Sequence, residues 1–437
     1  MRKTKLAEES TVKRRINKVG YDRNGYLEDT QVLKLVLIGS FILNKLYGGY
    51  LKYLDNSYLE KEPPRNVKDV YDEEEYKKWL SYQKEGGRVD LISDIVDSAV
   101  VLLILIFNIH SRVFLLFTGL NVYLQYLLTI TIFGLVSLIV SIPFDHYDTF
   151  VIEEKYGMNK TTKKTFVLDK IKEAILSLIL SYGLLMLIMF LFERFGNKGV
   201  ILAIIAVIII SILISLIVIP IMRIFNKFDP LEDGELKDGL ISLCEKYGVK
   251  VKKICVKDAS RRTTKANAFC TGLTKKKTIS LDDNLVNGYT TEQIVAVFAH
   301  EFAHARYNHQ IKSLPFAFLR TVIMMIALGI LMNYSQPFIA FGFLEVNYFF
   351  AFTLMELISW PVSTVFDIIS SHLSRKHEYQ ADAFAASEGY GDALISSLKK
   401  LCKDSLTNLN PHPLVVKLTY SHPTLSQRID AIKNVKA

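Results

Sequence analysis

Long apolar segments alternate with polar stretches along the chain, and this pattern predicts its fold class. The most apolar segment, residues 199–222, contains no charged side chain, and a helix of this length crosses a hydrocarbon core about 30 Å thick. Helices in the core of soluble proteins seldom need such a long unbroken apolar run. We therefore expect an α-helical membrane protein whose transmembrane helices lie at residues 31–51, 92–117, 120–142, 171–192, 199–222, 314–333 and 344–368.

The polar stretches between these segments define the expected domains. They are a basic N-terminal extension at 1–30, helices one to five with their loops at 31–222, a polar stretch at 223–313, helices six and seven at 314–368, and a polar tail at 369–437. Residues 250–256, 268–271 and 278–281 are predicted to be strands. A helix is predicted to begin at Thr290, because Thr290 and Gln293 have the spacing of a capping box. We expect the two polar stretches to form one α+β domain.

The composition and the charge agree with a membrane protein. Half of the residues (50%) are hydrophobic, and the formal net charge is +9. Lys and Arg lie mainly between the apolar segments, where they meet lipid headgroups, so membrane lipid rather than nucleic acid is the expected partner. By the positive-inside rule, the loops at 143–170 and 223–313 and the tail are cytosolic. Seven spans then place the N-terminus in the lumen, although its own basic residues favour the opposite side.

A metal-binding motif lies on the helix that is predicted to begin at Thr290. The segment HEFAH places His300 and His304 on one helical face, so both imidazoles can bind one zinc ion while Glu301 reaches the attacking water. The cysteines form no C-x-x-C pair, so the sequence indicates no thiolate site. Catalytic zinc needs a third protein ligand and an open position. We therefore expect one zinc ion per chain, with a third ligand from elsewhere in the sequence.

Glu378 is the best candidate for that third ligand. Asp382 follows it by one helical turn, so one carboxylate can bind the metal while the other bonds to a ligand histidine. His377 is predicted to lie on the surface, because neighbouring residues of a helix point about 100° apart.

Three further residues lie close to these motifs in the sequence or near the C-terminus. His309 lies off the ligand face of its helix, so we expect it to be a polar residue or to contact a metal ligand from the outside rather than to bind the metal. His422 and Arg428 are candidate donors to the oxyanion of the transition state.

Seven motifs in order resemble those of the integral-membrane zinc CAAX prenyl proteases, the family that processes prelamin A and mating-pheromone precursors. They are FVIEEKYGMNKTT at 150–162, FDPLEDGELKDGL at 228–240, ANAFCTG at 266–272, HEFAHARYNH at 300–309, SQP at 335–337, SRKHEYQADAFA at 374–385 and YSHPTLSQRI at 420–429. The resemblance implies a ring of seven helices around a large intramembrane chamber, closed by a cytosolic, gluzincin-like α+β zinc protease domain.

The resemblance also implies a role for each site residue. His300, His304 and Glu378 correspond to the zinc ligands, Glu301 to the general base, and Asp382 to the residue that orients a ligand histidine. Asn267 corresponds to a residue that holds the substrate backbone, and His422 and Arg428 to residues that steady the transition state or the outer shell of the metal.

The implied substrates are prenylated proteins or peptides that end in Cys-a-a-X. Members of this family release the last three residues, and some make a second cut upstream. The implied location is the membrane of the endoplasmic reticulum, with the inner nuclear membrane as a further site.

Three other interpretations remain open at the level of the sequence. The first is a general membrane quality-control metalloprotease without prenyl preference, although such enzymes have fewer spans. The second is a site-2 type protease, whose HExxH motif would lie inside a membrane segment rather than in a polar stretch. The third is a non-enzymatic scaffold, which the presence of Glu301 and all the ligand candidates disfavours.

Overall fold

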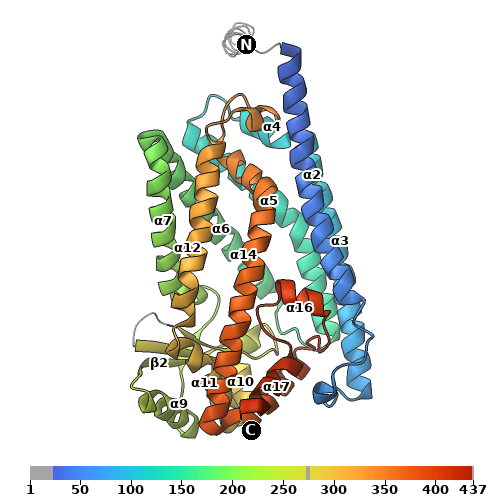
Figure 1. Ribbon diagram of the computed structural model, residues 1–437, viewed down its shortest axis with the longest axis vertical. Coiled ribbons are helices and arrows are strands. Elements are labelled where there is room, and N and C mark those ends of the chain that lie inside the picture. Colours follow the sequence, from blue (N-terminus) through green and yellow to red (C-terminus); the bar gives the residue numbers. More distant parts are fainter. Residues whose placement is uncertain (1–22, 272–275, 436–437) are drawn as a thin grey trace.

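The computed structural model describes residues 23–271 and 276–435, as a tall bundle of helices with a polar domain at one end (Figure 1). The bundle contains α2 (Arg23–Asn56), α3 (Glu73–Ile106), α4 (Ile109–Leu116), α5 (Val122–Tyr147), α6 (Lys163–Phe195), α7 (Asn197–Leu216), α8 (Val218–Met222), α12 (His309–Leu331), α13 (Gln336–Ile339) and α14 (Tyr348–Ala385). Most of the basic extension predicted at 1–30 lies outside the described residues.

The polar domain combines a small sheet with six helices and several short helical turns. Its elements are β1 (Phe228–Pro230), α9 (Glu235–Lys246), β2 (Lys250–Lys257), β3 (Ala268–Thr271), β4 (Lys276–Asp282), α10 (Asp283–Gly288), α11 (Thr291–Arg306), α15 (Gly391–Asp404), α16 (Pro413–Thr419) and α17 (Leu425–Val435). Short helical turns lie at Arg65–Val67, Asp148–Glu153, Ala259–Arg261 and Ala386–Tyr390.

The seven long helices of the bundle close into a ring. Around it, α2 contacts α3, α3 contacts α5, α5 contacts α6, α6 contacts α7, α7 contacts α12, α12 contacts α14, and α14 contacts α2. In the described part of the chain, 6 helices are long and apolar enough to cross a membrane, and α3 with α4 makes a seventh span with a 65° bend. The predicted fold class, an α-helical membrane protein with a small α+β domain, is therefore confirmed.

Two hydrophobic cores close the two ends of the ring. The core far from the polar domain includes Leu37, Phe41, Leu105, Ile188, Ala203, Leu328, Phe338, Phe350 and Leu354, which come from six of the helices and from α13. At this end α6 also touches α14, where the rings of Phe192 and Tyr348 lie 6.5 Å apart. The other core belongs to the polar domain, so buried apolar side chains pack at both ends of the ring.

Charged pairs join neighbouring helices between the two cores. Lys45 lies 3.4 Å from Asp97 across α2 and α3, and Arg320 lies 2.8 Å from Asp367 across α12 and α14. A charged side chain that faces lipid is costly, so these pairs favour a water-accessible space inside the ring. Seven helices about 9 Å apart in a closed ring leave a free width of about 10 Å after side chains are counted. This arrangement suits the chamber that the resemblance implies.

Two membrane segments differ from their predicted form. Segment 199–222 is not one helix, because α7 ends at Leu216 and a short α8 follows. Pro220 lacks the N–H that would bond to the Leu216 carbonyl, and its ring clashes with that carbonyl. Segment 92–117 bends at Asn108, which adopts a left-handed conformation (φ 54°) that asparagine tolerates better than most residues.

The sheet of the polar domain leaves one strand at its edge beside the metal-binding helix. The strand order is β1-β2-β4-β3, with β2 parallel to β4 and the other two pairs antiparallel. The three predicted strands are present, whereas the three-residue β1 was missed. β3 ends the sheet and contacts α11.

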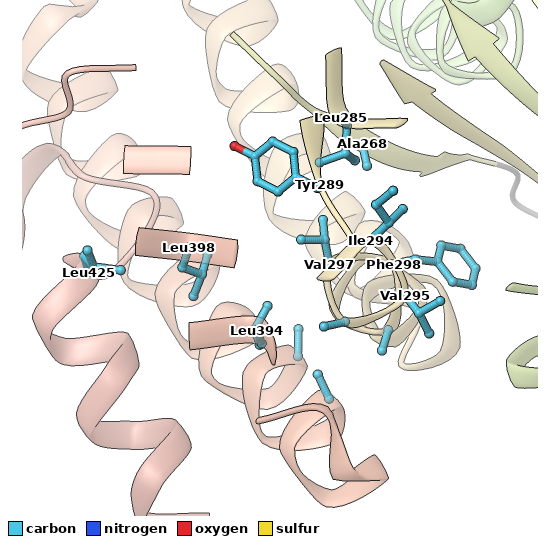
Figure 2. Close-up of a cluster of buried hydrophobic side chains, with 14 of the residues drawn as sticks. Ala268, Leu285, Tyr289, Ile294, Val295, Val297, Phe298, Leu394, Leu398 and Leu425 are labelled. Atoms are coloured by element: carbon cyan, nitrogen blue, oxygen red, sulfur yellow. The ribbon is translucent and has the colours of Figure 1, made fainter. Parts of the chain in front are cut away.

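Helix α11 is clamped in the core of the polar domain. Its predicted start is confirmed, since Thr290 Oγ1 accepts from the Gln293 N–H and Gln293 Oε1 accepts from the Thr290 N–H. Figure 2 shows its apolar side chains between Ala268 and Leu285 on one side and Leu394 on the other. A fully buried side chain of this size stabilises the fold by about 1.5–3 kcal/mol, so several together hold the helix rigidly.

Candidate metal centre

Three side chains converge where α11 meets α14. His300 Nε2 lies 3.2 Å from His304 Nε2 and 3.4 Å from Glu378 Oε2, and His304 Nε2 lies 3.3 Å from Glu378 Oε1. These three residues form a group that can hold a metal ion. The structure therefore brings together the three residues that the sequence selected as ligands.

The residue that completes this group is carried by a membrane helix. α14 runs without interruption from Tyr348 to Ala385, so Glu378 lies on the continuation of the seventh span. The predicted polar tail thus begins inside a helix rather than at a domain border. This rigid connection fixes the position of Glu378 relative to the membrane.

The surroundings of Glu378 favour a cation. Its Oε2 atom is buried, and in the described part of the chain no side chain donates a well-aligned hydrogen bond to it, although His422 Nδ1 lies 2.9 Å away. Burial and the Arg428 charge lower the pKa of His300, but Asp382 and Glu378 outweigh both and raise it to about 9. The two carboxylates thus stabilise positive charge next to the His300 ring.

Asp382 and Arg428 hold His300 from behind. Asp382 Oδ1 lies 2.9 Å from His300 Nδ1, the ring nitrogen that faces away from the metal-binding group. Arg428 donates to both carboxylate oxygens of Asp382, at 2.9 and 2.7 Å. The side chains of Asp382 and Arg428 are 1% and 12% exposed, so this bidentate pair is shielded from solvent.

Glu301 and His422 lie next to the metal-binding group in the sequence or in space, and neither side chain is fully buried. Glu301 follows His300 on α11, is half-buried, and within the described residues makes no hydrogen bond or ion pair. The His422 side chain is 63% exposed although its ring contacts Glu378. Both side chains can therefore meet a molecule that approaches from solvent.

Asn267 lies outside this cluster, immediately before the edge strand β3. Its side chain is exposed, and its Oδ1 accepts from the Ala268 N–H at 2.8 Å. Its own carbonyl accepts from the Asp282 N–H at 2.9 Å, which ties it to β4. The free edge of β3 begins at this residue.

Two features of the site were missed from the sequence. His309 was expected to be polar or outer, and its contact with a ligand histidine at 3.0 Å agrees with this. His377 was expected to lie on the surface, yet its ring stacks on that of His309 with centroids 4.1 Å apart. The loop at 150–162 was singled out without a role, and it braces the approach to β3: the Lys160 N–H bonds to the Arg262 carbonyl at 3.0 Å and the Thr264 N–H to the Met158 carbonyl at 3.1 Å. The only signal in the sequence for this contact was the motif at 150–162 itself.

Comparison with known proteins identifies the family. Residues 54–227 match the family model of the CAAX prenyl protease N-terminal region with five membrane helices, and residues 230–436 match peptidase family M48. The CAAX prenyl protease 1 of Saccharomyces cerevisiae is 31% identical over 433 residues, which cover 92% of this chain and 95% of the relative. The chain belongs to the CAAX prenyl protease 1 family.

Further family members agree in sequence and in structure. The probable CAAX prenyl protease 1 of Schizosaccharomyces pombe is 31% identical over 423 residues, 91% of this chain and 88% of the relative. The crystal structure of S. mikatae Ste24p superposes with a TM-score of 0.86 at 31% identity, covering 92% of this chain and 99% of that one. The chain is therefore a multi-pass membrane metalloprotease. These matches support the prenyl protease interpretation and not the quality-control alternative.

Proposed function

We propose that this chain is a zinc-dependent endopeptidase that removes the C-terminal tripeptide from prenylated CaaX proteins. The observation that carries the proposal is the metal-binding group of His300, His304 and Glu378, with Glu301 next to His300 on the same helix. The names of the relatives supply the substrate class, because they are CAAX prenyl proteases. A second cut upstream, which some family members make, is part of the proposal.

The spacing of the three donors suits zinc. Bond lengths of about 2.0–2.2 Å in a tetrahedral site place neighbouring ligand atoms roughly 3.3–3.5 Å apart. The separations between His300, His304 and Glu378 are 3.2, 3.3 and 3.4 Å. Two imidazoles and one carboxylate are also a common donor set of catalytic zinc sites, and they leave the fourth position open.

Each residue of the site has a distinct role in this proposal. Zinc held there would polarise the scissile carbonyl and acidify the attacking water. Glu301 takes the proton from that water, because its carboxylate is available and adjacent. The exposed His422 donates to the oxyanion, whereas the shielded Arg428 neutralises Asp382, which in turn orients His300.

The substrate backbone is proposed to pair with the free edge of β3. An extended peptide that adds to a sheet edge gains main-chain hydrogen bonds in register with the neighbouring strand. β3 lies beside α11, so such a peptide runs past the metal-binding helix. Asn267 heads this edge with an exposed side chain, which suits a contact to the peptide backbone.

We also infer the orientation of the protein in the endoplasmic reticulum membrane. The first described residues of α2 lie at the end of the bundle opposite the polar domain (Figure 1). With the basic polar domain in the cytosol, α2 therefore starts in the lumen. The isoprenoid is sheltered where the helix ring meets membrane lipid, while the CaaX segment reaches the polar domain.

Cleavage of two matched peptides tests the substrate class. Purified protein in lipid nanodiscs is given a farnesylated CaaX peptide and its unfarnesylated form, each with and without a zinc chelator. We expect the chelator to stop both reactions and the farnesylated peptide to be preferred on the order of tenfold, because the bilayer already shelters part of the lipid. Equal cleavage of both peptides would contradict the prenyl preference.

A further inference from the structure

A histidine without a role in the proposed mechanism lies against one of the metal-binding histidines. His309 begins α12, and its Nδ1 lies 3.0 Å from Nδ1 of His304. On the other side of its ring, Nε2 lies 3.0 Å from Oε1 of Gln380. Gln380, His309 and His304, from α14, α12 and α11, thus form a hydrogen-bond network that ends at the metal-binding group.

The donor and the acceptor of each hydrogen bond in this network follow from the positions of the ring protons. A metal bound by the Nε2 lone pair of His304 leaves the ring proton on Nδ1, so His304 donates to His309. His309 then accepts at Nδ1 and carries its own proton on Nε2, which faces the carbonyl oxygen of Gln380. Every donor meets an acceptor in this arrangement, and the other tautomer of His304 would lose its bond to the metal.

Local structure holds the His309 ring in place. Asn308 adopts a left-handed conformation (φ 54°), which separates α11 from α12 and lets His309 turn back toward His304. His309 is 4% exposed, and its ring stacks on His377 at an interplanar angle of 8°. The acceptor atom is therefore fixed before any metal arrives.

The two ligand histidines have different partners. His300 is backed by the carboxylate of Asp382, whose charge is compensated by Arg428, whereas His304 is backed by an imidazole and an amide. Outer partners of this kind orient metal ligands, and their loss typically lowers metal affinity about 10- to 100-fold. No charged group is needed on the His304 side, because an imidazole nitrogen is already a good acceptor.

We propose that His309 and Gln380 are positioning residues that fix His304 in the tautomer and orientation that bind the metal. The proposal rests on the metal centre described above and extends it to two residues on the membrane helices α12 and α14. Through these two side chains, both helices contribute to metal affinity indirectly, by way of His304.

Substitutions at His309 separate hydrogen bonding from packing. His309→Phe keeps a flat ring against His377 but removes the acceptor, so we expect metal affinity to fall about 10- to 100-fold. His309→Gln offers an amide oxygen to His304 and an amide N–H to Gln380, so it restores affinity to within about threefold of the original. The neighbouring exposed residue provides the control, because Gln310→Ala leaves the chain of bonds intact.

The measurement is the dissociation constant for Zn²⁺, obtained by competition with a fluorescent chelator on metal-free protein. A Phe variant that binds Zn²⁺ as tightly as the unmodified protein, or a Gln variant that loses as much as Phe, would overturn the proposal. If the His309 variants do not fold, Gln380→Leu decides, since unchanged affinity in that variant overturns it and a several-fold loss supports it. An unmodified protein that binds no Zn²⁺ would instead refute the proposed function.

Discussion

Replacing Arg428 by methionine tests whether the buried charges behind the metal centre stabilise one another. The guanidinium donates two hydrogen bonds to Asp382, whose side chain is 1% exposed, and one of its nitrogens also lies 3.3 Å from Nδ1 of His300. Methionine fills a similar volume, so the change removes the charge with little loss of packing. Asp382 is then left buried with only His300 as a partner.

The expected loss of stability is large for a single substitution. Removing one partner of a buried ion pair costs about 3–5 kcal/mol, because the remaining charge is left without compensation. For a domain of ordinary size, each kcal/mol shifts the melting temperature by roughly 2–4 °C, so a decrease of roughly 6–20 °C is expected. The exposed Lys433 lies on the same helix, and Lys433→Met should change stability by less than about 0.5 kcal/mol.

A double substitution identifies the cause of that loss. In Arg428→Met with Asp382→Asn, the buried carboxylate is gone, while the asparagine oxygen still accepts from His300 Nδ1. We therefore expect the double variant to melt at a higher temperature than Arg428→Met alone, with a coupling of about 0.5–3 kcal/mol. Melting of the zinc-loaded proteins is followed at one scan rate by scanning fluorimetry. Additive losses in the double variant would refute the reasoning.

Three further predictions concern the metal, the substrate and the topology. Glu378→Ala should lose bound metal by elemental analysis, and a variant that still holds one zinc per chain would remove Glu378 from the site. Asn267→Ala should weaken cleavage of prenylated and unprenylated peptides alike and leave the metal in place, so a loss confined to one peptide would argue against a backbone contact. A tag at residue 1 should be protected from protease in sealed microsomes, whereas its digestion would show a cytosolic N-terminus.

The membrane helices could be predicted because each needs a long apolar run, but their ends could not. α3 begins at Glu73 and α14 ends at Ala385, well outside the apolar segments 92–117 and 344–368. These extensions are polar helices that pack against the polar domain, and hydropathy does not detect them. The three-residue strand β1 was missed because it forms only by pairing with β2.

The site could be predicted as far as local spacing and the resemblance reached. The four-residue separation of His300 and His304 is enough to predict that they share a helical face. Glu378 was predicted as the third ligand from its four-residue spacing to Asp382 and from the motif at 374–385. The contact between His304 and His309 was beyond that reasoning, because it depends on a left-handed residue between two helices. Contacts between residues far apart in the sequence are fixed by the packing of α14 against its neighbours and not by any local pattern.

The central claim is that Glu301, beside a zinc ion, drives the release of the tripeptide from a prenylated CaaX peptide. Its most direct test compares the unmodified protein with Glu301→Gln on a farnesylated CaaX peptide, with the released tripeptide followed by mass spectrometry and zinc counted in the same samples. We expect one zinc per chain in both proteins and tripeptide release by the unmodified protein alone, because the amide cannot take the proton from water. Release at a similar rate by Glu301→Gln, or cleavage at another bond, would contradict the account.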